Sequence, residues 1–325
     1  MKPLSIVAYF DGRLGREKQT RSILNALSGM TSVHVESIKV SVAPAAYLKN
    51  LSAYFFSFLL PVRSESKSHS VDLIIGTGTH THIPMILEKK SRGGLSSHLV
   101  RVVTCMSPEA FLSNTFDLCC IPMHDDPPTR ENVLVTLGPP SPVVFEKRHK
   151  PDRGLILLGG LDTKSHIWKS AETASQIKII IANNPGILWT VSSSPRTPED
   201  TCRELENMAV SMQQLTFYRS KDTPAGWVEE QYALNGTAWV TADSISMVYE
   251  ALTAGCSVGI LPVEWVRQDN KFKKSLQLLA EKGIIVDFGA WQKGAPMPTV
   301  KKEQFNESFH CAQEILKRWW PDRLQ

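Results

Sequence analysis

The sequence lacks the features that mark several specialised classes of protein. Its six cysteines include no pair spaced as CxxC, so neither a disulfide framework nor a structural zinc site is expected. Its longest apolar run, residues 51–62, has about 12 residues, whereas a membrane-spanning helix needs about 20. A formal charge of only +4 does not predict a nucleic-acid partner unless the cations cluster. The sequence also has no internal repeat and no low-complexity tract.

What is present is the composition of a globular protein. Hydrophobic residues make up 42% of the chain and charged residues 21%, and 325 residues are enough for two domains of roughly 150 residues each. The segment Leu137 to Gly154 holds four prolines and a run of charges, which makes it the best linker candidate. We therefore expect domains over residues 1–145 and 146–302, with a C-terminal helix over 303–325 that packs back across the cleft between them.

Short apolar runs alternate with helix-length segments in both halves, a pattern typical of parallel sheets covered by helices. The first run is expected to be a buried strand rather than part of a signal peptide. The expected fold class is α/β, with two Rossmann-like domains that face a central cleft. The predicted strands cover residues 4–10, 71–75, 99–104, 117–121, 154–158, 187–192, 215–218, 238–241, 257–261 and 284–287. The predicted helices cover residues 15–28, 44–60, 81–90, 165–183, 199–212, 225–234, 244–254, 270–282 and 304–320.

The segment Ala238 to Pro262 combines a strand end, a helix and a second strand. Asp243 or Ser244 is placed to cap the helix, and Gly255 to close it. The amides at such a helix start, together with the hydroxyls of Ser244 and Ser246, would form an anion site suited to a diphosphate.

Glu250 lies four residues after Ser246, one turn further along the same helix face. A carboxylate there could accept two hydrogen bonds from a ribose diol whose phosphates lie at the helix start. A capped helix with a solvated glutamate has the same spacing, so the sequence leaves both interpretations open.

A second feature is the hydrophobic strand that runs into Gly159 and Gly160. Two glycines at a strand end let a ligand approach the backbone closely, and Lys164 could neutralise a phosphate. An ordinary tight turn explains the same glycines.

Together these features resemble the nucleotide-sugar half of GT-B glycosyltransferases. The matching residues are the glycine turn, the helix with Glu250, then Gly255, Pro262 and the stretch 269–271. Within that fold they are similar to the lipid-linked N-acetylglucosamine transferase of peptidoglycan synthesis. The resemblance implies that Glu250 holds the ribose, that the helix start holds the diphosphate, and that a polar side chain after the next strand, such as Asn270, touches the donor sugar.

A closer resemblance spans most of the chain. The motifs are DGRLGREKQ (11–19), GTGTHTHIP (76–84), FDLCCIPMHDDPP (116–128) followed by NVLVTLG (132–138), LLGG (157–160), SSSPRTP (192–198) and TADSISMVYEA (241–251). By these motifs the chain is identified as a bacterial-type member of the elongated-mitochondria family, which is named for a plant mitochondrial fission factor. Bacterial members are often labelled nucleoside-diphosphate-sugar epimerases by inference.

The first loop departs from the DG-x-PGHENQ pattern of that family. It has Leu14, Arg16 and Lys18 instead, so no histidine is available there. The two cations could suit an anionic acceptor, and a solvated helix start explains them equally well.

Candidate general bases follow strands of the first half, where open α/β sheets bind their ligands. His80 and His82 follow the strand at 71–75, and Asp11 follows the first strand. An imidazole titrates near neutral pH and could activate an acceptor hydroxyl. A capping or packing role for either histidine is the alternative. His124, beside Asp125, is a similar candidate that a polar loop also explains. No metal site is expected because a helical HxxxH arrangement is absent.

Three further residues follow strands of the second half. Arg196 could reach the donor phosphates, and Tyr218 with Arg219 could frame the nucleobase. The complete set predicted to bind the donor is Gly159, Gly160, Lys164, Arg196, Tyr218, Arg219, Asp243, Ser244, Ser246, Met247, Glu250 and Asn270.

The leading hypothesis is a GT-B-like glycosyltransferase that uses a nucleoside-diphosphate sugar, expected to be a UDP-sugar, without a separate cofactor. The acceptor would be a cell-envelope glycan or a lipid-linked glycan. An epimerase with the same donor site, and a non-catalytic scaffold on a degenerate glycosyltransferase fold, are the alternatives. A cytoplasmic location is expected. Peripheral contact with the membrane remains open, because a buried helix also explains the apolar residues that could dock there, namely Leu51, Phe55, Phe56, Phe58 and Leu59.

Overall fold

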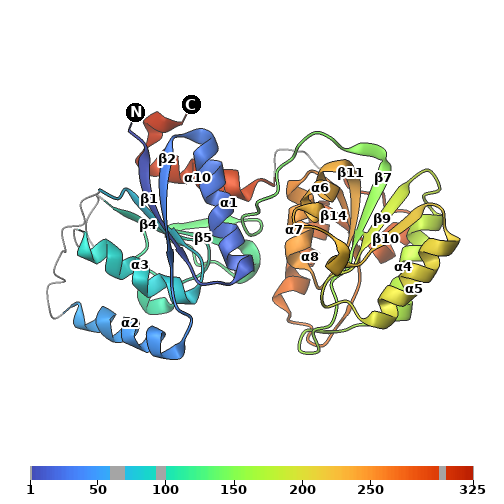
Figure 1. The fold of residues 1–325 in the computed structure, drawn as a ribbon, viewed down its shortest axis with the longest axis horizontal. Coiled ribbons are helices and arrows are strands. Elements are labelled where there is room, and N and C mark those ends of the chain that lie inside the picture. Colours follow the sequence, from blue (N-terminus) through green and yellow to red (C-terminus); the bar gives the residue numbers. More distant parts are fainter. Residues whose placement is uncertain (1, 59–69, 93–99, 300–304, 325) are drawn as a thin grey trace. The chain divides into compact units, whose positions relative to one another are not determined.

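The computed structural model describes residues 2–58, 70–92, 100–299 and 305–324, which form two α/β units (Figure 1). Unit 1 comprises Met1–Pro142 and Asn306–Gln325, and unit 2 comprises Val143–Phe305. The C-terminal helix therefore belongs to the same unit as the N-terminal sheet.

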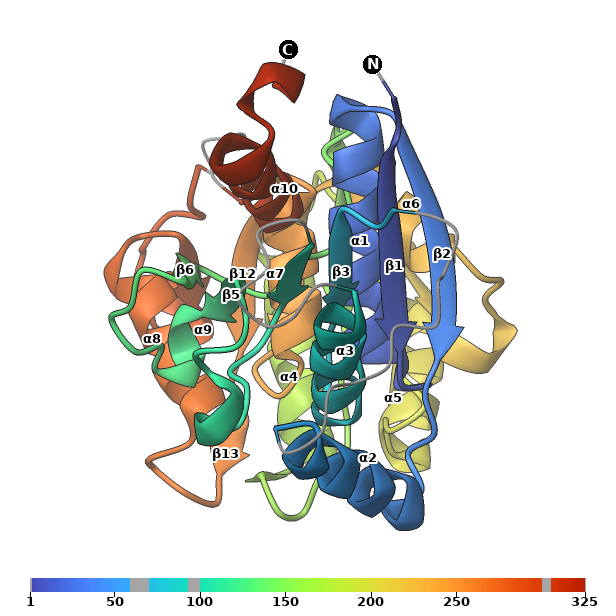
Figure 2. The same ribbon diagram turned by 90° about the vertical axis from the view of Figure 1, so that its left-hand side faces the viewer.

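Unit 1 is built on a parallel six-stranded sheet of order β2-β1-β3-β4-β5-β6 (Figure 2). Its strands are β1 (Leu4–Phe10), β2 (Val33–Lys39), β3 (Leu73–Gly76), β4 (Arg101–Thr104), β5 (Leu118–Pro122) and β6 (Val133–Thr136). Helices α1 (Leu14–Met30) and α10 (Glu307–Trp319) pack on one face. Helices α2 (Pro44–Phe56) and α3 (Thr79–Ser91) pack on the other.

Because the side chains of a strand alternate between two faces and both faces of β1 are covered, β1 is apolar apart from Ser5. Ile6 and Phe10 face the α1 and α10 side, whereas Val7 and Tyr9 face the α2 and α3 side, and all four side chains are buried. Edge strand β2, by contrast, is largely exposed and carries charged residues, as edge strands commonly do.

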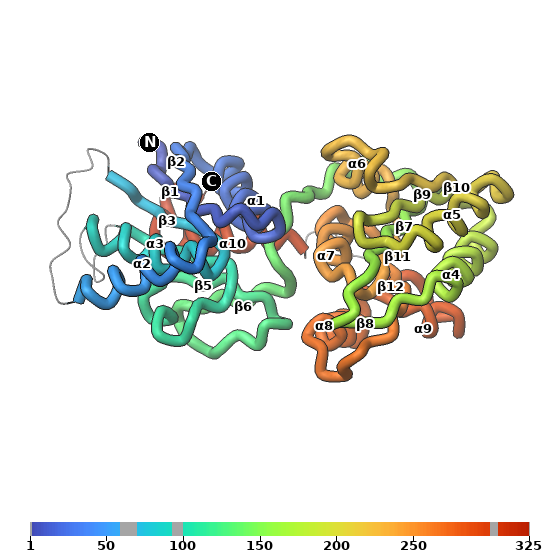
Figure 3. The backbone as a smooth tube through the Cα atoms, turned by 60° about the horizontal axis from the view of Figure 1, so that its bottom comes forward, coloured from blue at the N-terminus to red at the C-terminus, as the bar shows by residue number. Residues whose placement is uncertain are grey.

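Unit 2 is built on a second parallel sheet, of order β10-β9-β7-β11-β12-β14. Its strands are β7 (Lys150–Leu157), β9 (Leu188–Ser192), β10 (Leu215–Tyr218), β11 (Asn235–Thr241), β12 (Ser257–Leu261) and β14 (Ile285–Asp287). One face is covered by α6 (Trp227–Leu234), α7 (Ile245–Thr253) and α8 (Lys271–Glu281). The other is covered by α4 (Ser170–Ala182), α5 (Glu199–Ser211) and α9 (Phe288–Gln292) (Figure 3).

A two-stranded antiparallel ribbon extends unit 2 beyond this sheet. It consists of β8 (His166–Ile167) and β13 (Glu264–Trp265). The first of these strands follows β7 and the second follows β12, and β11 lies between β7 and β12 in the sheet. The ribbon therefore joins the segments that leave the carboxyl ends of the two strands flanking β11.

The predicted strands and helices are all present, with ends that shift by a few residues. The exception is the helix predicted from residue 165, which begins at Ser170 because ribbon strand β8 precedes it. The sequence prediction missed β2, β6, the ribbon strands and α9. Within the described residues, strands β2 and β6 bury few side chains, so the apolar pattern that marks the central strands is weak in them. Residues 59–60, 99 and 304, which were assigned to a helix, a strand and the C-terminal helix, lie outside the described residues.

Helix α10 should contribute to the core of unit 1. Ile315 is fully buried in the cluster formed with α1, so Ile315→Ala should lower the free energy of unfolding by about 2–5 kcal/mol. Gln313→Ala, at an exposed position of the same helix, should change it by less than about 0.5 kcal/mol. Chemical denaturation of the two variants measures the difference, and equal effects would contradict the packing of α10 described here.

Candidate functional site

The polar residues predicted in the second half gather at the carboxyl edge of the unit 2 sheet. Gly159 and Gly160 follow β7, Arg196 follows β9, and Asp243 with Ser244 follows β11. The carboxyl ends of parallel strands meet at one edge, which is where open α/β sheets bind their ligands. We call these five residues the glycine-turn cluster.

The amides of the glycine turn are held by neighbouring side chains. The Gly159 amide donates to Thr241 Oγ1 over 2.7 Å, and the Gly160 amide donates to Asp243 Oδ2 over 3.1 Å. A Cβ at Gly159 would lie 1.9 Å from Asp243 Oδ2, and one at Gly160 would lie 2.1 Å from the backbone of Arg196. Packing within the protein is therefore sufficient to require both glycines.

An ion pair between a half-exposed arginine and a buried aspartate completes the cluster. Arg196 Nη2 lies 3.0 Å from Asp243 Oδ2, and the Asp243 side chain is only 1% exposed. Its second oxygen, Oδ1, is buried and has no hydrogen-bond partner among the described residues. Arg196 Nη1 also approaches the Gly160 carbonyl oxygen at 3.4 Å. The arginine expected to reach phosphate thus lies beside the glycine turn, with an internal carboxylate as its present partner.

Ser244 occupies the cap position of α7, but its hydroxyl donates to Asp243 Oδ2 over 3.3 Å rather than binding a helix amide. The first turn of α7 consequently has no side-chain cap and contains no acidic residue. Ser246, on that turn, is exposed. Amides at an uncapped helix start, with the positive end of the helix dipole, suit an anion.

Glu250 lies one turn further along α7 and is oriented by a buried tyrosine. The Tyr232 hydroxyl donates to the Met247 carbonyl oxygen over 3.2 Å and lies 3.4 Å from Glu250 Oε2. Burial, followed by the charge of Glu250, raises the pKa of Tyr232 well above its ordinary value, so the phenol keeps its proton and donates.

The remaining predicted donor residues have other partners in the structure. Arg219 forms ion pairs with both Glu199 and Glu206, at 2.7 and 2.5 Å, and Tyr218 packs against Trp227 with ring centroids 4.9 Å apart. Asn270 Oδ1 accepts the Phe272 amide and caps α8. The side chain of Lys164 is exposed.

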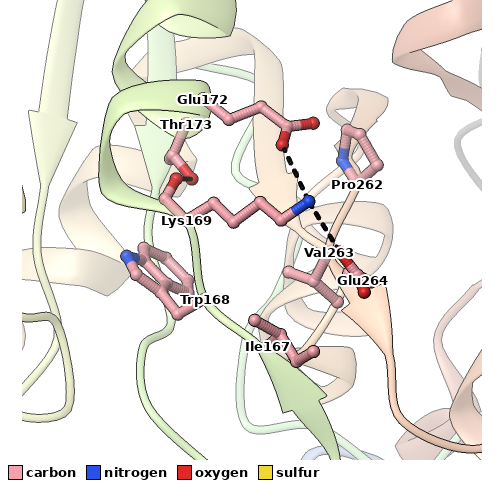
Figure 4. A pocket seen from close by; sticks show the side chains of 8 residues that line it. All are labelled: Ile167, Trp168, Lys169, Glu172, Thr173, Pro262, Val263 and Glu264. Atoms are coloured by element: carbon pink, nitrogen blue, oxygen red, sulfur yellow. Dashed lines mark hydrogen bonds and ion pairs between the residues drawn. The ribbon is translucent and has the colours of Figure 1, made fainter.

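Two cavities lie along this edge of the sheet near the glycine turn. The Ser193 cavity, of about 380 Å³, is lined by Ser193, Ser194, Arg219 and Ser220 at the ends of β9 and β10. The Trp168 cavity, of about 200 Å³, contains Lys169 between two carboxylates, with Glu264 at 2.6 Å and Glu172 at 3.7 Å (Figure 4).

Sequence reasoning missed His166, which holds the glycine turn from the ribbon. Its Nε2 lies 2.8 Å from the Gly160 carbonyl oxygen, and because a carbonyl only accepts, Nε2 carries the proton. The side chain is buried, with Trp168 and Trp265 against it. The sequence signal that could have identified His166 is its position between the glycine turn and the helix that follows.

In unit 1, the predicted bases differ in what they can reach. Asp11 is fully buried and pairs with Arg16 over 3.2 Å. His82 is also fully buried, with Nδ1 2.8 Å from Glu109 Oε2 and Nε2 3.2 Å from Thr104 Oγ1. His80 is half-buried, and its Nδ1 has no hydrogen-bond partner in the part of the chain that the structure describes.

Glu109 was missed although it too follows a strand of this sheet, β4. Its side chain is 24% exposed and binds the buried His82. Partial burial raises the pKa of Glu109, but the hydrogen bonds from His82 and from its own amide, with the nearby histidines, outweigh burial and hold the pKa below its ordinary value. His124 lies at the end of β5, in a short 3-10 helix at Met123–Asp125.

The apolar residues proposed for membrane contact divide into two groups. Leu51 packs against the core of unit 1, whereas Phe55, Phe56 and Phe58 are 57%, 61% and 57% exposed. Leu59 lies outside the described residues. Phe111, from the loop after β4, stacks on Phe55 at 6.2 Å and is 45% exposed. We call the four phenylalanines the phenylalanine patch.

The described residues contain no helix with the length and apolarity needed to cross a bilayer. They also contain no group of three or more His, Cys, Asp or Glu side chains placed to bind a metal ion.

The hydrogen-bonded pair of Glu109 and His82 should make the stability of unit 1 depend on pH. Because the folded pKa of Glu109 is below its ordinary value of 4.5, the pair stabilises the fold above about pH 4.5, and this contribution is lost as pH falls through the lower folded pKa. Glu109→Gln should flatten the loss of unfolding free energy between about pH 5 and about pH 3. Glu131→Gln, at an exposed site, should leave the profile unchanged, and identical profiles for all three proteins would refute the assignment.

Comparison with solved structures identifies the fold. MurG from Acinetobacter baumannii matches with a TM-score of 0.55 and 14% sequence identity over 98% of this chain and 100% of that chain. A Listeria monocytogenes protein provisionally named UDP-N-acetylglucosamine 2-epimerase matches with a TM-score of 0.54 and 11% identity over 98% of both chains. The glycotransferase of kitacinnamycin matches with a TM-score of 0.51 and 10% identity over 98% of this chain and 100% of that chain. The chain thus has the expected α/β, GT-B-like fold, and at these identities the likeness concerns the fold alone.

Sequence comparison is more specific. No curated protein matches the chain. The family model described as mitochondrial fission ELM1 matches residues 14–319, nearly the whole length. The family expected from the ordered motifs is therefore confirmed, and the chain belongs to the mitochondrial fission ELM1 family.

Proposed function

We propose that unit 2 binds a nucleoside-diphosphate sugar and that the protein is a GT-B-like glycosyltransferase, with no separate cofactor. The observation that carries the proposal is the glycine-turn cluster, in which glycine amides, an arginine and an uncapped helix start meet at one sheet edge beside the Ser193 cavity. A phosphate ester suits the uncapped helix start and Arg196, whereas the two glycine amides already donate to Thr241 and Asp243.

Each part of the donor has a matching part of this edge. The diphosphate would lie at the first turn of α7, with Arg196 beside it, and the ribose diol would bind Glu250, which Tyr232 orients. The base would occupy the Ser193 cavity, beside Ser193, whose hydroxyl accepts the Ser220 amide, and Ser194, whose hydroxyl donates to the Gly159 carbonyl oxygen. The expected base is uracil.

Transfer would be an inverting displacement. A base removes the proton of the acceptor hydroxyl, the new glycosidic bond forms, and the bond from the sugar to the diphosphate breaks with its electron pair on the leaving phosphate. Among the predicted bases of unit 1, we assign this role to His80, because its side chain is half-buried, although the Nδ1 atom is itself buried. Asp11 and His82 are fully buried and act as positioning residues. The acceptor would be a cell-envelope or lipid-linked glycan.

Isothermal calorimetry with UDP and UDP-N-acetylglucosamine tests the donor site. Glu250→Gln should weaken UDP binding about tenfold, or about 1.4 kcal/mol, because a neutral amide is a poorer acceptor for the ribose hydroxyls. Glu281→Gln, at an exposed position at the end of α8, should bind like the wild type. Binding that survives Glu250→Gln unchanged would reject the ribose assignment, and the absence of binding to any nucleoside diphosphate would reject the donor site.

Product analysis with a bound donor separates the reaction classes. A new glycoside supports transfer. An isomerised sugar indicates the epimerase alternative instead. An unchanged donor, in the presence of envelope extracts as acceptor, indicates the scaffold alternative.

We also propose that unit 1 docks peripherally on the inner face of the cytoplasmic membrane through the phenylalanine patch. Four exposed aromatic rings on neighbouring elements, with Lys90 Nζ 4.2 Å from the Phe58 ring centroid, have the apolar and cationic character that interfacial binding uses.

Phe55→Ser/Phe56→Ser should reduce co-sedimentation with vesicles that contain anionic phospholipid by at least about threefold. Val210→Ser, which alters an exposed apolar residue of unit 2, should co-sediment like the wild type, and an equal effect of both changes would refute the patch.

A further inference from the structure

A third cavity in unit 2 is not used by the proposed donor site. It measures about 320 Å³ and lies at the carboxyl ends of β11, β12 and β14, against helix α8. We call it the Trp265 cavity. Its wall is largely apolar, with side chains from the sheet, the ribbon, α8 and α9, notably Ile260, Trp265, Leu276, Ala280, Ile285 and Phe288.

The charged side chains on this wall are already bonded to the protein. Asp287 Oδ1 accepts the Ala290 amide over 2.9 Å and caps α9. Lys273 Nζ donates to Gln268. The interior therefore favours an apolar occupant, because a polar one would lose its hydrogen bonds to water without replacement.

The charged residues that line the cavity are Lys273 and Asp287, and Lys273 lies in a first turn of α8 that is rich in lysine. Helix α8 begins at Lys271 and carries Lys273 and Lys274 in its first turn, with no acidic residue there. The helix start adds the positive end of its dipole. Asp269, just before the helix, lies 3.5 Å from Arg267. An anionic group at the mouth of the cavity would therefore be stabilised.

We propose that the Trp265 cavity binds an anionic amphiphile with a single apolar chain, whose chain packs against Trp265 and Leu276 and whose head group binds near Lys273. A benzene ring occupies a cavity of about 150 Å³, so this cavity holds roughly twice as many carbons, or roughly twelve. The site is independent of the glycine-turn cluster and does not rest on glycosyl transfer.

The probe is 11-bromoundecanoate, because bromine quenches the fluorescence of an adjacent indole. The wild type should show saturable quenching, and Trp265→Phe should remove most of it. Ala280→Trp, which fills the cavity with a side chain, should weaken binding at least about tenfold, whereas Ala280→Ser keeps the space and should bind normally. Circular dichroism and thermal melting establish that each variant is folded.

The head-group assignment has its own control. Lys273→Gln should weaken binding of 11-bromoundecanoate about threefold to tenfold but leave binding of the neutral 11-bromoundecanol unchanged. Lys282→Gln, beyond the far end of α8, should alter neither.

The proposal is overturned if the wild type shows no saturable quenching, if Ala280→Trp binds as well as Ala280→Ser, or if Lys273→Gln weakens both probes equally. Trp265→Phe and Lys273→Gln keep the test decisive if Ala280→Trp does not fold. Nucleotide binding by the same preparations reports separately on the donor site.

Discussion

A buried aspartate packed against a glycine organises the ligand edge of each unit. Each aspartate side chain is at most 1% exposed and carries an arginine partner. The two sets are Asp11 on Gly78 with Arg16, and Asp243 on Gly159 with Arg196. A carboxylate taken out of water must be compensated by hydrogen bonds and a cation, so it determines where the neighbouring amides and the guanidinium lie. The loops that follow the central strands depend on these contacts for their shape.

The same interaction governs what unit 2 can bind. Asp243 Oδ2 accepts the Gly160 amide and pairs with Arg196, which are groups that a phosphate would also use. The donor that we propose would therefore bind beside this carboxylate, at the uncapped first turn of α7, or would draw Arg196 away from it. His166 Nε2 donates to the carbonyl oxygen of Gly160, in the peptide group that follows this residue. The glycine turn is thus held on both sides. Because the turn has little freedom to move, a ligand is expected to fit the turn as it stands.

Much of the fold could be predicted because the central strands are buried on both faces. Strands such as β1 and β12 are apolar apart from one serine each. Edge strand β2 and the two-residue strands of the ribbon lack that signal, since they bury little surface or have too few residues to show a period. The strand ends also indicated where polar groups would gather. They did not indicate that Arg219 would pair with two glutamates or that Asn270 would cap α8.

The sequence by itself determined the α/β class, the order along the chain of the ten strands that it predicts, the family and the edge at which Asp243, Arg196 and the glycine turn lie. These follow from local patterns, because periodicity, caps and glycine turns are properties of short segments. The tertiary structure alone decided the partners of each charged group, the role of Glu109 beside His82, the assignment of α10 to unit 1 and the presence of the Trp265 cavity. Each of these depends on residues far apart in the chain, whose distances are set by how the layers pack and not by any spacing visible in the sequence.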